Sequence, residues 1–200
     1  MHAILSEMRI RMSSQTLQQS ARPDSSRWLQ TYYFMRGGVT LLWIAAALTI
    51  GARVPSIAAA LMLAYPAWDA VANIGDAQRS GGLINNPSQA LNAAISVTTT
   101  IAVFFALASG PHAVIAVFGV WAMLSGVLQL VTGIRRRNAG GQWPMILSGL
   151  QSTLAGIFFI KSATDTGNPG ITAIVPYAAF GAFYFLVSAF WLTWRSARQQ

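Results

Sequence analysis

Two charged side chains interrupt long apolar stretches of the sequence, and they are its strongest candidates for chemistry. Arg36 lies near the start of the stretch 33–51, and Asp69 lies near the end of the stretch 55–74. Each stretch has roughly the 20 apolar residues that are needed to cross a bilayer. A charge at that depth is costly, so such residues usually pair with one another, carry protons or bind a ligand.

The sequence leaves three interpretations of Arg36 and Asp69 open. At a rise of ~1.5 Å per residue, antiparallel helices place both side chains at the same depth, where they can pair and lock two helices together. Alternatively, Arg36 extends to the lipid headgroups and Asp69 stands alone. In the third interpretation Asp69 is a proton or ligand site, because intramembrane ionisable residues often mark proton relays and substrate paths.

Uncharged polar side chains extend this group into a second part of the sequence. Counted from the proline that begins each helix, Ser125 occupies the position of Asp69, and Gln129 occupies that of Asn73. The two members on each helix are one turn apart and share a face. Since these residues lie in the half of the spans nearest the basic loops, the sequence predicts a hydrogen-bonded core or a cavity open to that side. It predicts no polar conduction path from side to side.

Groups suited to catalysis or metal binding are scarce elsewhere. The sequence has no cysteine and only two histidines, His2 and His112. A metal site needs three or four clustered ligands, and the other acidic residues are scattered in loops and in the N-terminal tail. We therefore expect no catalytic residue, metal or cofactor. His112, in a turn near the loop 161–165, gains charge as the pH falls and is a candidate pH sensor; the alternative is a solvated loop histidine.

The composition indicates the environment of the chain. Apolar residues make up 54% and charged residues 9% of the 200 residues, whereas a soluble domain has about 25% charged residues. Such a chain cannot cover a water-facing surface, and it is too apolar for disorder. The composition predicts a membrane protein, and the net charge of +8 is then a signal of membrane topology rather than of nucleic-acid binding.

Six apolar stretches are long enough to cross a bilayer, which predicts an all-α bundle of six transmembrane helices. They are 33–51, 55–74, 91–109, 112–134, 143–160 and 171–194. Lys and Arg concentrate in the cytoplasmic loops of membrane proteins. Ten of them lie on the side of the termini, against Arg53 and Lys161 on the other, so both termini are predicted to be cytoplasmic. Arg135, Arg136 and Arg137 belong to this signal; alternatively, they bind anionic lipid headgroups.

Prolines at regular spacing indicate an internal repeat. Pro55, Pro111 and Pro169 each precede the second helix of a pair, at spacings of 56 and 58 residues. This pattern predicts three helical hairpins in the same orientation. The hairpins are 33–74, 91–134 and 143–194, within a membrane domain of residues 32–195. A polar, basic tail of residues 1–31 precedes this domain, and a short tail of residues 196–200 follows it.

The N-terminal tail lacks the apolar segment of a signal peptide. Residues 4–12 have the pattern of a short amphipathic helix on the membrane surface, and the alternative is a mobile tail. Met1, Met8 and Met12 are all candidates for the start of translation.

Small residues are frequent within the spans, where they allow helix backbones to approach closely. Seven glycines are candidates for such contacts: Gly37, Gly38, Gly119, Gly126, Gly149, Gly156 and Gly181. Gly149 and Gly156 are seven residues apart and therefore share one helix face. Pro66 and Pro176 lie inside spans, where we expect each of them to kink its helix.

Three segments in the second half of the chain resemble those of a known family. They are FGVWAMLSGVLQL at 118–130, the arginine cluster 135–137 and WPMILSG at 143–149. In these segments the chain resembles the HdeD-like acid-resistance membrane proteins, most clearly over residues 111–160. The resemblance implies six spans built from short two-helix repeats in the bacterial inner membrane, and an association with survival of acid stress. It supplies no catalytic motif.

Two functions remain in competition. The first is a non-enzymatic membrane protein of acid stress that acts through packing, through a partner or on the membrane. Its partners are the lipid bilayer and either a second copy or another membrane protein, and nucleic acid is excluded. The second is a small transporter or proton-linked permease that uses Asp69 with Arg36. An enzyme acting on lipid requires a second acid–base group near Asp69, and the sequence offers none.

Overall fold

The computed structural model describes residues 27–135 and 143–198, where the chain is helical apart from its turns. Six helical segments are long and apolar enough to cross a membrane. They are the first helix Arg27–Gly51, α2 Pro55–Arg79, α3 Pro87–Ser109, α4 Pro111–Arg135, α5 Trp143–Ser162 and the segment Ile171–Ala197. In this last segment the 3-10 turn η3 (Ile171–Ile174) leads into α6 (Val175–Ala197). The chain is an all-α, multi-pass membrane protein, as its composition predicts.

The helices extend beyond the predicted apolar stretches. The first helix begins at Arg27 rather than at residue 33, and α2 continues to Arg79 rather than ending at residue 74. The headgroup layers widen the bilayer from a core of about 30 Å to roughly 40–45 Å, so polar helical turns continue outside the apolar core. Residues 27–31, assigned above to the tail, are therefore part of the first helix.

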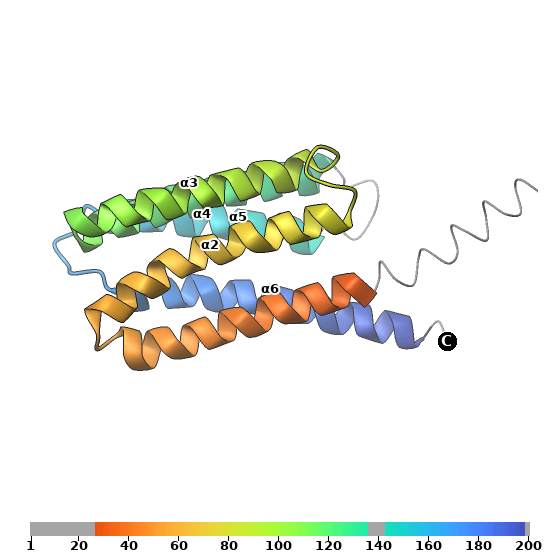
Figure 1. Cartoon of the computed structure of the whole chain (residues 1–200), viewed down its shortest axis with the longest axis horizontal. Helices are drawn as coiled ribbons and strands as arrows, with labels where there is room; N and C mark the ends of the chain where they lie inside the picture. Colours follow the sequence, from red (N-terminus) through yellow and green to blue (C-terminus); the bar gives the residue numbers. More distant parts are fainter. Residues whose placement is uncertain (1–26, 136–142, 199–200) are drawn as a thin grey trace, which may run out of the picture.

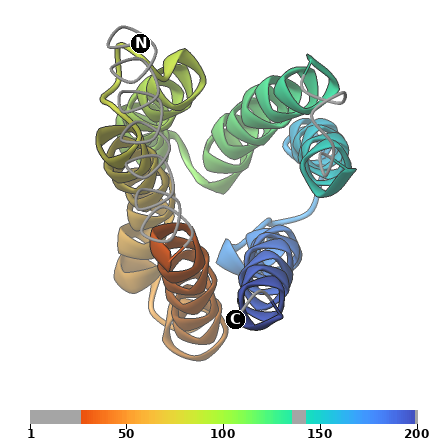
Figure 2. The same ribbon diagram turned by 90° about the vertical axis from the view of Figure 1, so that its right-hand side faces the viewer.

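The helices follow one another around a ring in chain order, and the first helix lies beside α6 (Figure 2). A hydrogen bond of 2.8 Å from Gln30 Nε2 to Ser196 Oγ joins the first helix to α6. The rings of Phe34 and Phe190 meet edge to face beside it, with centroids 5.2 Å apart. The start of the first helix and the end of α6 lie at the same end of the bundle (Figure 1), which we call the terminal end; the opposite end is the distal end.

Glycines let α4 and α5 pack more closely than α2 and α3 or α3 and α4 do. A Cβ atom added to Gly126 would lie 2.7 Å from the carbonyl oxygen of Gly149, and one added to Gly156 would lie 2.6 Å from that of Gly119. Real side chains do not approach backbone so closely, so only glycine fits these four positions. The predicted close contact at Gly149 and Gly156 is confirmed.

The other candidate glycines behave differently. A Cβ atom on Gly37 would lie 2.8 Å from the Leu186 side chain and 3.6 Å from the carbonyl oxygen of Ala182. One on Gly181 would approach the Tyr65 hydroxyl to 3.9 Å, an ordinary contact. Outside its own helix backbone, no described residue comes within 4 Å of the same position on Gly38. The expectation of close packing is therefore wrong for Gly38 and Gly181.

The two prolines inside the predicted spans have different positions. Pro66 lies in the interior of α2, where it is buried. Pro176 lies instead in the first turn of α6, directly after η3. A proline at a helix start removes no hydrogen bond, because the first N–H groups of a helix have no partner within it. Pro176 therefore lies within the predicted span, but it begins α6 rather than interrupting it, so the expected kink of an α-helix does not apply there.

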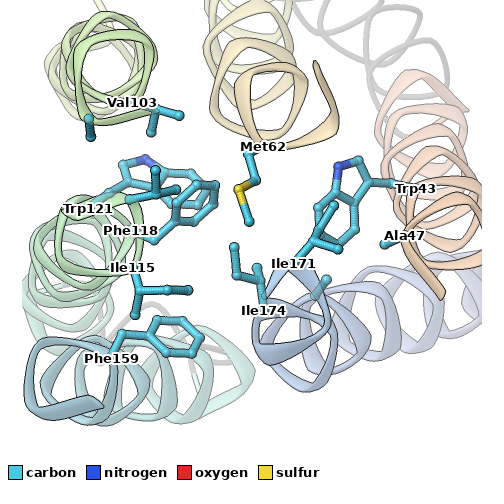
Figure 3. Close-up of a cluster of buried hydrophobic side chains, with 13 residues drawn as sticks. Trp43, Ala47, Met62, Val103, Ile115, Phe118, Trp121, Phe159, Ile171 and Ile174 are labelled. Carbon is cyan, nitrogen blue, oxygen red and sulfur yellow. The ribbon is translucent and has the colours of Figure 1, made fainter. Parts of the chain in front are cut away.

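Apolar side chains fill the interior of the bundle in its distal half. Figure 3 shows Met62, Ile115, Phe118 and Ile174 directed towards one another from α2, α4 and η3. Ile115, Phe118 and Ile174 are completely buried, and Met62 is 5% exposed. This apolar core separates the distal end from the polar side chains of the other half.

Candidate functional site

An ion pair joins the first helix to α2. Arg36 Nη2 donates to Asp69 Oδ1, and each side chain keeps 13% of its surface exposed. The guanidinium also lies over the ring of Phe185 on α6, 4.4 Å from its centroid, and Arg36 Nη1 donates to the hydroxyl of Tyr32 at 3.1 Å. Arg36 and Asp69 therefore pair at a shared depth, as the first interpretation of the sequence expects.

The Asp69 carboxylate accepts hydrogen bonds from three helices. Besides Arg36, Asn73 Nδ2 donates to Oδ2 at 3.0 Å, and Ser96 Oγ on α3 donates to Oδ2 at 2.8 Å. All three partners are donors, which suits an ionised carboxylate, because that group can only accept. Ser96 is completely buried, so the network ties α2 to α3 inside the bundle.

Ser96 also connects Asp69 to aromatic side chains near the middle of the bundle. Trp121 Nε1 on α4 donates to Ser96 Oγ at 3.0 Å. The Trp121 ring meets Tyr65 edge to face with centroids 5.6 Å apart. Tyr177 continues the layer on α6 and hydrogen-bonds Ser152 Oγ on α5 at 3.1 Å. Together, the polar network and the aromatic rings connect the first helix with α2, α3, α4, α5 and α6.

Replacing Ser96 by alanine tests this connection. Ser96→Ala leaves the buried Trp121 N–H without its acceptor and removes one donor from Asp69. We therefore expect the free energy of unfolding to fall by about 1–3 kcal/mol. The control is Thr98→Ala, which changes an exposed position of the same helix. Unfolding of both variants in detergent micelles, followed by tryptophan fluorescence, measures the difference. Equal stability of the two variants would show that the Ser96 bridge contributes nothing.

The other polar residues predicted for the site lie apart from the ion pair. Gln129 Oε1 accepts a long hydrogen bond of 3.5 Å from Ser148 Oγ. The Ser125 hydroxyl is buried and has no partner among the described residues. Asn73 is thus the one predicted uncharged residue that contacts Asp69, and the two helices related by the repeat do not share the same polar contacts.

The remaining candidates lie at the ends of the bundle. His112 Nε2 contacts the carbonyl oxygen of Asp165 at 3.1 Å, which places it against the predicted loop. Arg135 is exposed at the last position of α4, whereas Arg136, Arg137 and residues 4–12 lie outside the described residues. Within residues 27–135 and 143–198, no three His, Cys, Asp or Glu side chains gather as metal ligands would.

Sequence reasoning missed Ser96, Trp121 and Tyr32. Ser96 follows Asn92 by one helical turn, and Trp121 precedes Ser125 by one turn. Extending the polar face by one turn on each helix would have identified both residues. Nothing in the sequence indicates the contact of Tyr32 with Arg36 other than the spacing of four residues.

The central part of the chain matches a known protein family. Residues 91–161 match the family described as a short repeat of unknown function (DUF308). No curated protein and no solved structure matches the chain. The DUF308 segment contains Ser96, Trp121 and the four glycines between α4 and α5, whereas Arg36 and Asp69 precede it. The hydrogen bond from Ser96 to Asp69 therefore joins the DUF308 segment to the ion pair outside it.

Proposed function

We propose that the chain is a non-enzymatic, multi-pass protein of the bacterial inner membrane that contributes to survival of acid stress. The observation that carries this proposal is the DUF308 match over residues 91–161, which covers the segments that resemble the HdeD-like proteins. The protein acts through its packing in the bilayer, through a second copy or through another membrane protein. It uses no cofactor and binds no nucleic acid.

The proposed orientation places both termini in the cytoplasm. Ten Lys and Arg residues on the side of the termini, against two on the other side, support it through the positive-inside rule. The common location of the first helix start and the α6 end (Figure 1) fits this topology. Arg135, the last residue of α4, then lies on the cytoplasmic side.

The contacts of Asp69 support a structural role for the ion pair. Its carboxylate binds donors from the first helix, from α2 and from α3, so it holds three helices together. A proton-linked permease that uses Asp69 with Arg36 is the second candidate. The observation that favours it is the ionisable pair itself, which lies between transmembrane helices and stays 13% exposed.

Acid survival of a deletion strain separates the two functions. The strain is complemented with wild type or with Asp69→Asn, and the amount of protein in the membrane is measured for both. The non-enzymatic proposal expects loss of survival on deletion and equal rescue per molecule by the two forms, because the amide retains the size of the side chain. It expects a lower amount of the variant, since the neutral amide leaves Arg36 without its counter-charge.

Two outcomes would overturn this expectation. If Asp69→Asn reaches the membrane at the wild-type level but fails to rescue, the proton-linked mechanism replaces the structural one. If deletion does not change survival, the acid-stress role is wrong for this chain.

A further inference from the structure

We propose that the bundle interior between α3 and α4 binds water in its terminal half, at a site formed by Asn92 and Ser125. Asn92 Oδ1 and Ser125 Oγ are both buried, and neither has a hydrogen-bond partner among the described residues. Leaving a polar atom buried and unsatisfied is unfavourable, above all where lipid surrounds the protein. Two such atoms on neighbouring helices point to a bound molecule that hydrogen-bonds both.

The register of α3 against α4 places Asn92 and Ser125 at matching heights along the two helices. On the distal side, Trp121 Nε1 donates to Ser96 Oγ at 3.0 Å. On the terminal side, the hydroxyls of Ser88 and Thr132 meet at 3.4 Å. Asn92 lies one turn from Ser96 and one turn from Ser88 on α3, and Ser125 lies between Trp121 and Thr132 on α4.

The chemistry of the site favours water over an ion. The Asn92 carbonyl oxygen accepts a hydrogen bond, and the Ser125 hydroxyl both donates and accepts, so no full charge is present to balance an ion. Asn92 Nδ2 is directed to Asn73 Oδ1 at 3.4 Å, which adds a further acceptor nearby. A buried water commonly makes about three hydrogen bonds to groups of this kind.

The site is continuous with polar side chains that reach the terminal end. Asp76 Oδ2 accepts a hydrogen bond of 3.3 Å from Gln89 Nε2, and the Ser88–Thr132 contact lies beside it on α3. Towards the distal end, the buried residues Val103, Ile115 and Phe118 replace polar ones. Water therefore enters from the terminal end and stops before the apolar core.

The absence of cysteine from the sequence permits a direct test with single-cysteine variants. Only the thiolate reacts with methyl methanethiosulfonate, and a thiol in apolar surroundings does not ionise readily. Asn92→Cys is compared with Leu91→Cys, and Ser125→Cys with Leu124→Cys. The leucines are the neighbouring residues at the same depth, and they are 49% and 42% exposed on the lipid-facing surface.

We expect the cysteines at 92 and 125 to react about tenfold faster than their lipid-facing neighbours, because only they meet water. The measurement uses membrane vesicles, with the wild-type chain as the unlabelled control. Equal rates within both pairs would overturn the proposal, as would slow labelling at both interior positions. If one interior variant fails to accumulate in the membrane, the other pair decides. The result depends neither on acid survival nor on the orientation of the bundle, so it stands or falls separately from the proposed function.

Discussion

Gly126→Ala is expected to destabilise the bundle by about 3 kcal/mol, because an added methyl group cannot be accommodated where two backbones touch. The new Cβ atom would lie 2.7 Å from the carbonyl oxygen of Gly149 and 2.7 Å from Thr153 Oγ1. A flexible side chain could move aside, but a helix backbone can only retreat as a whole. The α4–α5 contact would therefore open along much of its length.

Gly75→Ala is the matched control for this substitution. Gly75 lies within α2, and no atom from elsewhere in the described part of the chain lies within 4 Å of its added Cβ atom. Alanine favours the helix over glycine by up to about 1 kcal/mol, so this variant should be as stable as wild type or slightly more stable. Unfolding in detergent micelles compares the two variants. Similar stability of both would show that the α4–α5 glycines tolerate a methyl group and that the packing argument is wrong.

The second large effect is expected when one member of the Arg36–Asp69 pair is replaced by an apolar residue. Asp69→Leu should destabilise the protein by about 3–5 kcal/mol, because it leaves a buried guanidinium without its counter-charge. Arg36→Leu should have a similar effect by leaving the carboxylate with only its two uncharged donors, Asn73 and Ser96. The free energy of unfolding of each variant, measured in the same micelles, gives the two single effects.

The double variant Arg36→Leu/Asp69→Leu completes the cycle. Since it removes both charges at once, we expect a smaller loss of stability than the sum of the single losses. A coupling energy near zero would mean that the two charges do not stabilise one another. Additive effects would then favour the interpretation in which Arg36 extends to the headgroups, despite its contact with Asp69.

The sequence was informative about helix positions because the bilayer leaves little choice of backbone structure. In lipid every backbone N–H and C=O must be paired within the segment, so each apolar stretch of sufficient length becomes a helix. The six predicted spans match the six membrane-length helices of the structure, with differences at their ends. Pro176 begins α6 rather than kinking it because the apolar residues before it form the 3-10 turn η3 rather than α-helix.

Part of the candidate site could also be predicted from local rules. The depth of Arg36 and Asp69 follows from the rise of a helix, and it made their contact one of the three interpretations that the sequence left open. The shared face of Gly149 and Gly156 follows from helical periodicity in the same way. Only the first prediction needed the further assumption that neighbouring segments are antiparallel.

The partners across helices were decided by the tertiary structure alone. Ser96 bonds both Asp69 and Trp121 only because α2, α3 and α4 meet with one particular rotation and register. Likewise, α5 packs most closely on α4, outside its predicted hairpin, because glycines on both helices let the backbones touch. The sequence determined which segments become helices, since that choice depends on local hydrophobicity and hydrogen bonding. Which faces meet depends on the simultaneous packing of all the helices, and this is a property of the assembled bundle.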